Sequence, residues 1–104
     1  MPHTLIFAPR ARDDLDSARR WLTQQGSGPV ARRKLAAIWT AIERLRDQPR
    51  LWPVGQHSSV RELPCDGGYR VLYEVIPDRG SRDESAGEIR VLRIFGPGQD
   101  RRTL

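Results

Sequence analysis

Three arginines in apolar, strand-like segments are the residues of this chain best suited to chemistry. They are Arg61, Arg70 and Arg93. A guanidinium group binds phosphate or carboxylate through paired hydrogen bonds, and it is almost never buried without a partner. Two or three of them on one sheet could hold phosphates or stabilise a phosphorane-like transition state. The structural alternative is that they pair across strands with nearby acids, namely Glu62, Glu74 or Glu88.

The strand-like segment 69–76 shows how these arginines could be presented, because its side chains alternate between two faces. One face carries two tyrosines and two valines and is typical of a core. The other face carries Arg70, Leu72 and Glu74. In the segment 88–95, alternation places Arg93 on the face of Arg70 if Leu92 and Ile94 face the core. The short segment 60–63 leaves the face of Arg61 open.

Other kinds of chemistry find little support in the sequence. His57 lies in a loop segment and is expected to be solvated, and Cys65 has no histidine at a spacing typical of a thiol nucleophile. With His3 as the only other histidine, no familiar metal-ligand spacing exists. Gly96-Pro97-Gly98 is followed by no Lys-Ser/Thr and is not a phosphate-binding loop. We therefore expect no metal and no cofactor.

The composition indicates one small domain, residues 1–104, with a net charge of +5. All but one of the 18 basic residues are arginine, and Lys34 is the only lysine. This surplus suits an acidic partner, either nucleic acid or an acidic protein, although a high-GC genome would produce the same bias. No long apolar run predicts a membrane span, and a single cysteine fits the reducing cytoplasm.

Two helices are predicted after a first strand at residues 3–8. Pro9 suits the first turn of a helix that should stop near Gly26, and Pro29 suits the start of a second helix that Pro49 ends. Both segments carry an apolar stripe at helical spacing, and the short break between them predicts an antiparallel hairpin. The stripe residues are Ala11, Leu15, Ala18 and Leu22, then Ala31, Leu35, Ile38, Ile42 and Leu45. We also expect Trp21 and Trp39 to pack between helices, and Trp52 to cap the edge of the core.

Three further strands are predicted at residues 60–63, 69–76 and 88–95, with a tight turn at Asp66-Gly67-Gly68. The polar segment 77–87 should be a hairpin loop. The fold class is therefore α+β, a helical hairpin followed by a three-stranded antiparallel meander. We expect the first strand to join an antiparallel sheet, with helices on one face and the other face open.

The chain resembles the RelE/ParE superfamily of bacterial type II toxins, and it is closer to the ParE branch. The segments that carry the resemblance are Ala11–Leu15, Ile42–Pro49, Val60–Leu63, Tyr69–Val75 and Val91–Phe95. The resemblance implies a toxin neutralised by a cognate antitoxin whose acidic, amphipathic segment wraps around it in a hetero-oligomer. A ParE-like toxin inhibits DNA gyrase and has no catalytic set of its own. Arg61, Arg70 and Arg93 are then candidates for contacting the target.

The RelE branch implies a different target, because its members cleave messenger RNA on the ribosome. They activate a 2′-hydroxyl against the adjacent phosphate, and they carry an arginine where Arg70 stands. They often have a tyrosine or histidine after the last strand, and residues 96–102 contain neither. In this alternative Arg70 is a phosphate or transition-state contact. A third possibility is an inactive relative that keeps the fold as a binding module.

Overall fold

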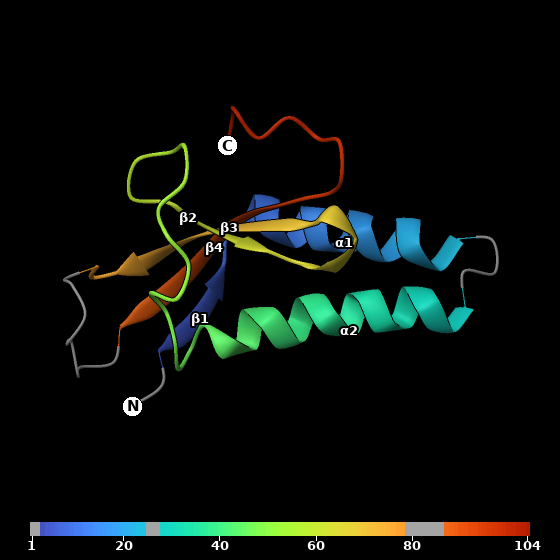
Figure 1. Ribbon diagram of the computed structural model, residues 1–104, viewed down its shortest axis with the longest axis horizontal. Coiled ribbons are helices and arrows are strands. Elements are labelled where there is room, and N and C mark those ends of the chain that lie inside the picture. Colours follow the sequence, from blue (N-terminus) through green and yellow to red (C-terminus); the bar gives the residue numbers. More distant parts are fainter. Residues whose placement is uncertain (1–2, 25–27, 79–86) are drawn as a thin grey trace.

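The computed structural model describes residues 3–24, 28–78 and 87–104. Its elements follow the predicted order. They are β1 (Thr4–Phe7), α1 (Pro9–Thr23), α2 (Gly28–Arg44), β2 (Arg61–Pro64), the 3₁₀ turn η2 (Asp66–Gly68), β3 (Arg70–Ile76) and β4 (Glu88–Phe95). The α+β class and the antiparallel helical hairpin are confirmed, and the two helices run side by side along the molecule (Figure 1). Of the predicted loop 77–87, residues 79–86 lie outside the described part.

The four strands form one sheet in the order β1-β4-β3-β2. Strands β2, β3 and β4 form the predicted antiparallel meander, but β1 pairs with β4 in parallel, from Thr4 opposite Glu88 to Phe7 opposite Val91. The expectation that β1 would join an antiparallel sheet was therefore wrong. The helical hairpin explains the direction, because it returns the chain to the start of β1, where the His3 N–H donates to the Arg46 carbonyl. Strand β2 therefore points in the same direction as β1. Because β3 is antiparallel to β2 and β4 is antiparallel to β3, β4 also points in the direction of β1.

The main core lies between the sheet and the two helices. Both predicted helix stripes contribute to it, with Ala11, Ala18, Ile38 and Ile42 almost fully buried. The sheet contributes the predicted tyrosine and valine face of β3, together with residues of β2 and β4. Pro9 stands in the first turn of α1, where its missing N–H costs no hydrogen bond. Neither helix, within the described residues, is long and apolar enough to cross a membrane.

The tryptophans divide between the core and the surface. Trp52 packs against the core edge as expected. Trp21 is 70% exposed, so its expected place between the helices was wrong. Trp39 is 43% exposed and packs edge-on against Phe7, with their ring centroids 5.6 Å apart. The exposed indole of Trp21 is an apolar surface that the fold itself does not use.

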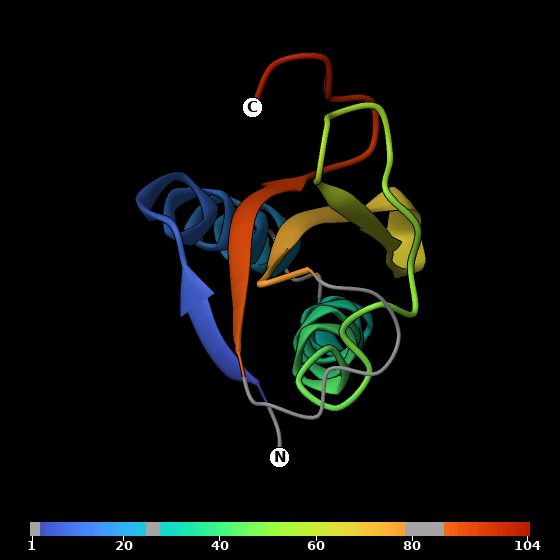
Figure 2. The same cartoon turned by 90° about the vertical axis from the view of Figure 1, so that its left-hand side faces the viewer.

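The second sheet face is not open along its whole length. Val60, Leu72 and Phe95 are buried there as a second apolar cluster, against which Leu104 packs. The segment before β2 and the tail after β4 pass over this side of the sheet (Figure 2). The expectation of an open face was therefore wrong in part. Its cover comes from two irregular segments that meet only in the folded chain.

A bulge in β4 changes the faces predicted by strict alternation. Val91 opposes Tyr73, but Arg93 opposes Leu72, so Leu92 is an extra residue between them. As a result Ile94 joins the helix-side core with Val91, whereas Leu92 packs with the second cluster. Arg93 lies on the face of Leu72 and Arg70, but the condition that both Leu92 and Ile94 face the helices is not met.

Candidate functional site

Arg61 is fully engaged at the outer edge of the sheet. It opposes Tyr73 in the β2–β3 pair, so it lies on the helix side, opposite the face of Arg70. Its Nε and Nη2 donate to the two carboxylate oxygens of Asp78 at 3.1 and 3.2 Å, and its Nη1 donates to the Trp52 carbonyl at 2.6 Å. Arg50 also donates to Asp78, at 3.0 Å. Arg61 thus ties β2 to the segments on either side.

The environment of Asp78 favours its ionised form. Burial by itself raises the pKa of this carboxyl, but hydrogen bonds from Arg61 and Arg50, and the charges of both, outweigh burial. The pKa of Asp78 is therefore lowered. The Asp78 side chain is only 24% exposed, so its ion pairs with the two guanidinium groups are partly shielded from water.

Arg93 is paired with a carboxylate from the first helix. Its Nε and Nη2 donate to Asp14 at 2.7 and 3.1 Å, and its guanidinium stacks over Phe95, 4.5 Å from the ring centroid. Asp14 also accepts the Ile94 N–H at 2.9 Å. The hydrogen bond from Asp14 raises the pKa of Arg93, and its negative charge adds to this against the effect of burial. This pair fixes α1 to β4.

Arg70 is held differently from the other two arginines. It is half-buried at the start of β3, opposite Phe95, and among the described residues it makes no ion pair and no side-chain hydrogen bond. It lines a hollow of about 280 Å³ between the η2 turn and the tail. The other lining residues are Gly68, Gly96, Gly98, Gln99 and Arg101. We call this the Arg70 hollow.

Two glycines allow the walls of the Arg70 hollow to come together. Gly68 has φ +83°, and a Cβ on it would lie 3.0 Å from the Pro97 side chain. Gly98 has φ +80°, a backbone conformation that residues other than glycine rarely adopt. The η2 turn and the tail are therefore shaped to approach each other where Arg70 begins its strand.

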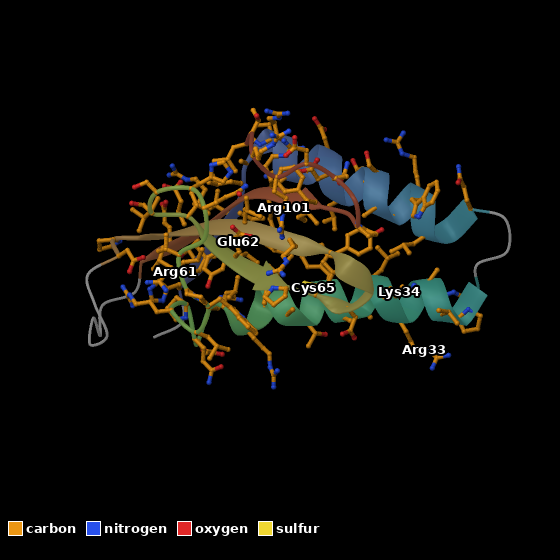
Figure 3. The ribbon with its side chains drawn as sticks, turned by 45° about the horizontal axis from the view of Figure 1, so that its top comes forward. Arg33, Lys34, Arg61, Glu62, Cys65 and Arg101 are labelled. Atoms are coloured by element: carbon orange, nitrogen blue, oxygen red, sulfur yellow. The ribbon has the colours of Figure 1, made fainter. Side chains whose placement is uncertain are left out.

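Arg101, which sequence reasoning missed, is the second guanidinium of the hollow. Its carbonyl accepts hydrogen bonds from the Gln56 side chain and His57 Nε2, both at 2.6 Å, and its Nη1 lies 3.5 Å from Glu62. Figure 3 shows Arg101 and Glu62 over the sheet, with Arg61 to the left of both. The two arginines at 101–102 are visible in the sequence as a basic tail, but the tail has no periodic pattern that would predict its position on the sheet. His57, expected to be solvated, is part-buried here.

None of the three sequence-predicted arginines pairs, within the described ranges, with the acids expected across the strands. Arg61 and Arg93 use Asp78 and Asp14 instead, while Glu62 contacts Arg101. Whether the three arginines contact a target stays a prediction. Of the three arginines, Arg70 is the one that forms no ion pair with an acidic residue among those the structure describes.

Cys65, which precedes the η2 turn, is a poor candidate for a nucleophile, and no metal-binding group is evident among the described residues. Burial, together with the charge of Asp66, raises the pKa of the Cys65 thiol to about 11 against the opposing charge of Arg70, so the thiol is protonated at neutral pH. Within the described ranges no three histidine, cysteine, aspartate or glutamate side chains are grouped so that they could hold a metal ion. The residues that line the hollow are suited to binding an anion and include no evident base.

A second, more apolar groove runs beside α1. It has a volume of about 370 Å³ and lies between the helix and the segment that follows β4. Ala18 and Trp21 line one side, and Tyr69, Ile94 and Pro97 line the other. We call it the α1 groove. The exposed Trp21 belongs to it.

Comparison with known proteins places this fold in a family. The family model described as "ParE toxin of type II toxin-antitoxin system, parDE" matches residues 5–100. A structure from the chromosomal ParDE toxin-antitoxin system of P. aeruginosa has a TM-score of 0.69 at 18% identity, over 91% of this chain and 96% of that one. The toxin-antitoxin complex RelBE2 of Mycobacterium tuberculosis has a TM-score of 0.58 at 24% identity, over 92% and 99%.

The two structures share the fold of this chain at low sequence identity. A search of curated proteins gives no significant match. The family model spans nearly the whole chain, including both helices and almost all of the four strands. This chain therefore belongs to the ParE toxins of type II toxin-antitoxin systems.

Proposed function

We propose that this ParE toxin inhibits DNA gyrase in the cytoplasm and that a cognate antitoxin neutralises it. The match of the ParE family model to residues 5–100 is the observation that carries the proposal. The lining of the Arg70 hollow offers guanidinium groups that can hold a partner, which supports a binding inhibitor. The chain acts, in this proposal, by holding its target rather than by cutting it.

Arg70 is the proposed contact to the target. A half-buried guanidinium that has no partner among the described residues keeps its hydrogen-bonding capacity for another molecule, and such a contact contributes more than an exposed one. Arg61 and Arg93 have structural roles in this proposal, because Arg61 pairs with Asp78 at 3.1 Å and Arg93 pairs with Asp14 at 2.7 Å. The predicted trio is thereby narrowed to one contact residue supported by two positioning residues.

The proposed antitoxin is acidic and amphipathic, and it forms a hetero-oligomer with the toxin. Its apolar side would cover the α1 groove and the exposed Trp21, and its acidic side would meet a chain of net charge +5. Both structures that share this fold come from toxin-antitoxin systems. A small domain also gains stability from a partner that binds only its folded state.

The test is a supercoiling assay with purified gyrase and free toxin. We expect wild-type toxin to block supercoiling and to stabilise cleaved DNA, and Arg70→Ala to need at least about tenfold more protein because a charge-assisted contact is lost. Arg90→Ala is the matched control, since Arg90 is an exposed arginine opposite Glu74 on the same sheet face. Added antitoxin should restore supercoiling. Unchanged supercoiling with excess wild-type toxin would contradict the proposal.

The same protein separates the two alternatives. Cuts inside codons of ribosome-bound messenger RNA that disappear in Arg70→Ala would favour a ribosome-dependent endonuclease. Expression without any effect on growth would favour an inactive binding module. The gyrase proposal requires neither result, because it predicts growth arrest with intact messenger RNA.

A further inference from the structure

The Arg70 hollow joins two guanidinium groups from distant parts of the chain. Arg70 comes from the start of β3 and Arg101 from the tail, and both line the same 280 Å³ space. We infer that this hollow is a binding site for a phosphate group, held by Arg70 and Arg101 and controlled by Glu62, which competes for Arg101. This inference rests on the proposed function for its biological meaning, since it names the chemistry of the contact assigned to Arg70.

The arrangement of the donors favours phosphate over carboxylate. One guanidinium can bind a planar carboxylate through two parallel hydrogen bonds, as Arg93 binds Asp14, and one carboxylate can also join two guanidinium groups, as Asp78 joins Arg50 and Arg61. A phosphate group carries about −1.5 to −2 charge at neutral pH, so it matches the charge of two guanidinium groups more fully than a single carboxylate does. Donors that converge from two walls suit a tetrahedral group with several acceptor oxygens. The volume is near the lower end of ligand pockets, about 300 Å³, so it fits a small group or one phosphate of a longer molecule.

Arg70 is the fixed half of the site. It lies on a central strand paired on both sides, to Pro64 and Phe95. No described residue neutralises its charge through an ion pair, and a half-buried, unpaired guanidinium is costly. An incoming anion would remove that cost. Glu74 shares its face but lies four residues further along the strand.

Arg101 is the movable half of the site, and Glu62 is its internal competitor. The Glu62 carboxylate accepts the Gln56 N–H at 3.1 Å and is packed so closely on Gly55 that a Cβ there would collide with it. Its side chain is 14% exposed, against 36% for Arg101, and the two charges are 3.5 Å apart. Arg101 can therefore turn from Glu62 to a bound phosphate, whereas Glu62 is held in place.

The experiment titrates the purified chain with sodium phosphate at constant ionic strength, because screening alone would otherwise change the apparent affinity. Binding is followed by NMR shifts of the glycine amides of the hollow. We expect Arg70→Ala to bind about tenfold more weakly and Arg101→Ala about threefold more weakly. Glu62→Gln keeps the size of the side chain and removes its charge, so it should bind about threefold more tightly. Arg90→Ala is the matched control and should bind like wild type.

Two further titrations identify what the site holds. A short single-stranded oligonucleotide that binds more tightly than phosphate, and only with Arg70 present, would support a nucleic-acid backbone as the source of the phosphate. Phosphate binding without oligonucleotide binding would support a small free phosphate compound. Acetate binding as well as phosphate, or equal losses in Arg70→Ala and Arg90→Ala, would overturn the inference. So would weaker binding in Glu62→Gln. Since gyrase is absent, failure here leaves the gyrase assay to be judged separately.

Discussion

Asp78 is the carboxylate on which the pairing of two arginines depends. Arg50 comes from the connection after α2 and Arg61 from β2, and both donate to Asp78 at 3.0–3.2 Å. The substitution Asp78→Asn puts a neutral amide in place of the carboxylate and leaves both guanidinium groups without a counter-ion. We expect the free energy of unfolding to fall by about 1–2 kcal/mol at neutral pH, since the site is only partly exposed. Urea unfolding of the two proteins measures this difference.

The effect of Asp78→Asn should depend on pH. The folded state holds the pKa of Asp78 below its ordinary value of 3.8, so the ion pairs give their full stabilisation above that value. The stabilisation is lost as pH falls through the lower pKa of the folded state, and the two unfolding curves should then converge. Asp100→Asn is the control, because Asp100 pairs with Arg102 on the exposed surface. A difference that stays constant down to about pH 2, well below the ordinary pKa of an aspartate, would contradict this origin.

The choice of partner for each arginine could not be predicted from the sequence. Strand alternation identifies only neighbours on adjacent strands, and it suggested Glu62, Glu74 and Glu88. Arg93 instead binds Asp14, 79 residues away, because α1 lies against β4 in the folded chain. Arg101 was missed for the same reason, since its position depends on His57 and Gln56. The alternating pattern of β3 did predict the sheet face on which Arg70 lies, whereas its role in binding stays a prediction.

The contact between α1 and β4 depends on Asp14. This carboxylate accepts two hydrogen bonds from Arg93 and one from the Ile94 N–H, and the side chains of Arg93 and Asp14 are only 12% and 15% exposed. Asp14→Ala leaves a partly buried guanidinium and a backbone donor unpaired. We expect the free energy of unfolding to fall by about 2–3 kcal/mol, measured by chemical denaturation.

A neighbouring aspartate provides the control for this element. Asp13 is exposed on the same turn of α1, so Asp13→Ala should change stability by no more than about 0.5 kcal/mol. Equal losses in the two variants would show that the effect comes from helix charge and not from the contact with β4. Restoring stability by Arg93→Met in the Asp14→Ala background would further support the pair, because no unpaired charge would remain.

The elements themselves were largely predictable, and the bulge was not. Prolines at the helix starts and apolar stripes at helical spacing carry local information, so α1 and α2 begin where expected, although α2 ends at Arg44 and not at Pro49. In β4 apolar residues occupy both faces, since Ile94 serves the helix-side core and Leu92 the second cluster. Near the bulge the sequence of β4 therefore shows no alternation of polar and apolar residues from which its register with β3 could be predicted. The extra residue at Leu92 is visible only in the pairing of β4 with β3 and in the packing of Leu92 on the second cluster.

The assembled molecule has two apolar clusters on opposite faces of one sheet, and the smaller one depends on the tail. Leu104 packs against the cluster of Val60, Leu72 and Phe95, while the Arg101 carbonyl is bound by two side chains of the segment before β2. The sequence predicted the larger cluster through its periodic helices. It could not predict the smaller one, because the tail and residues 54–60 have no periodic pattern.

Removal of residues 101–104 tests this division. It deletes the hydrogen bonds at Arg101 and uncovers Leu72 and Phe95, so we expect the free energy of unfolding to fall by about 2–3 kcal/mol and the protein to bind a hydrophobic dye. The helix signal in circular dichroism should remain, because α1 and α2 pack on the other face. Arg102→Ala is the control within the same tail, since its side chain is 83% exposed. Truncated protein as stable as wild type would mean that the tail rests on the second cluster without stabilising it.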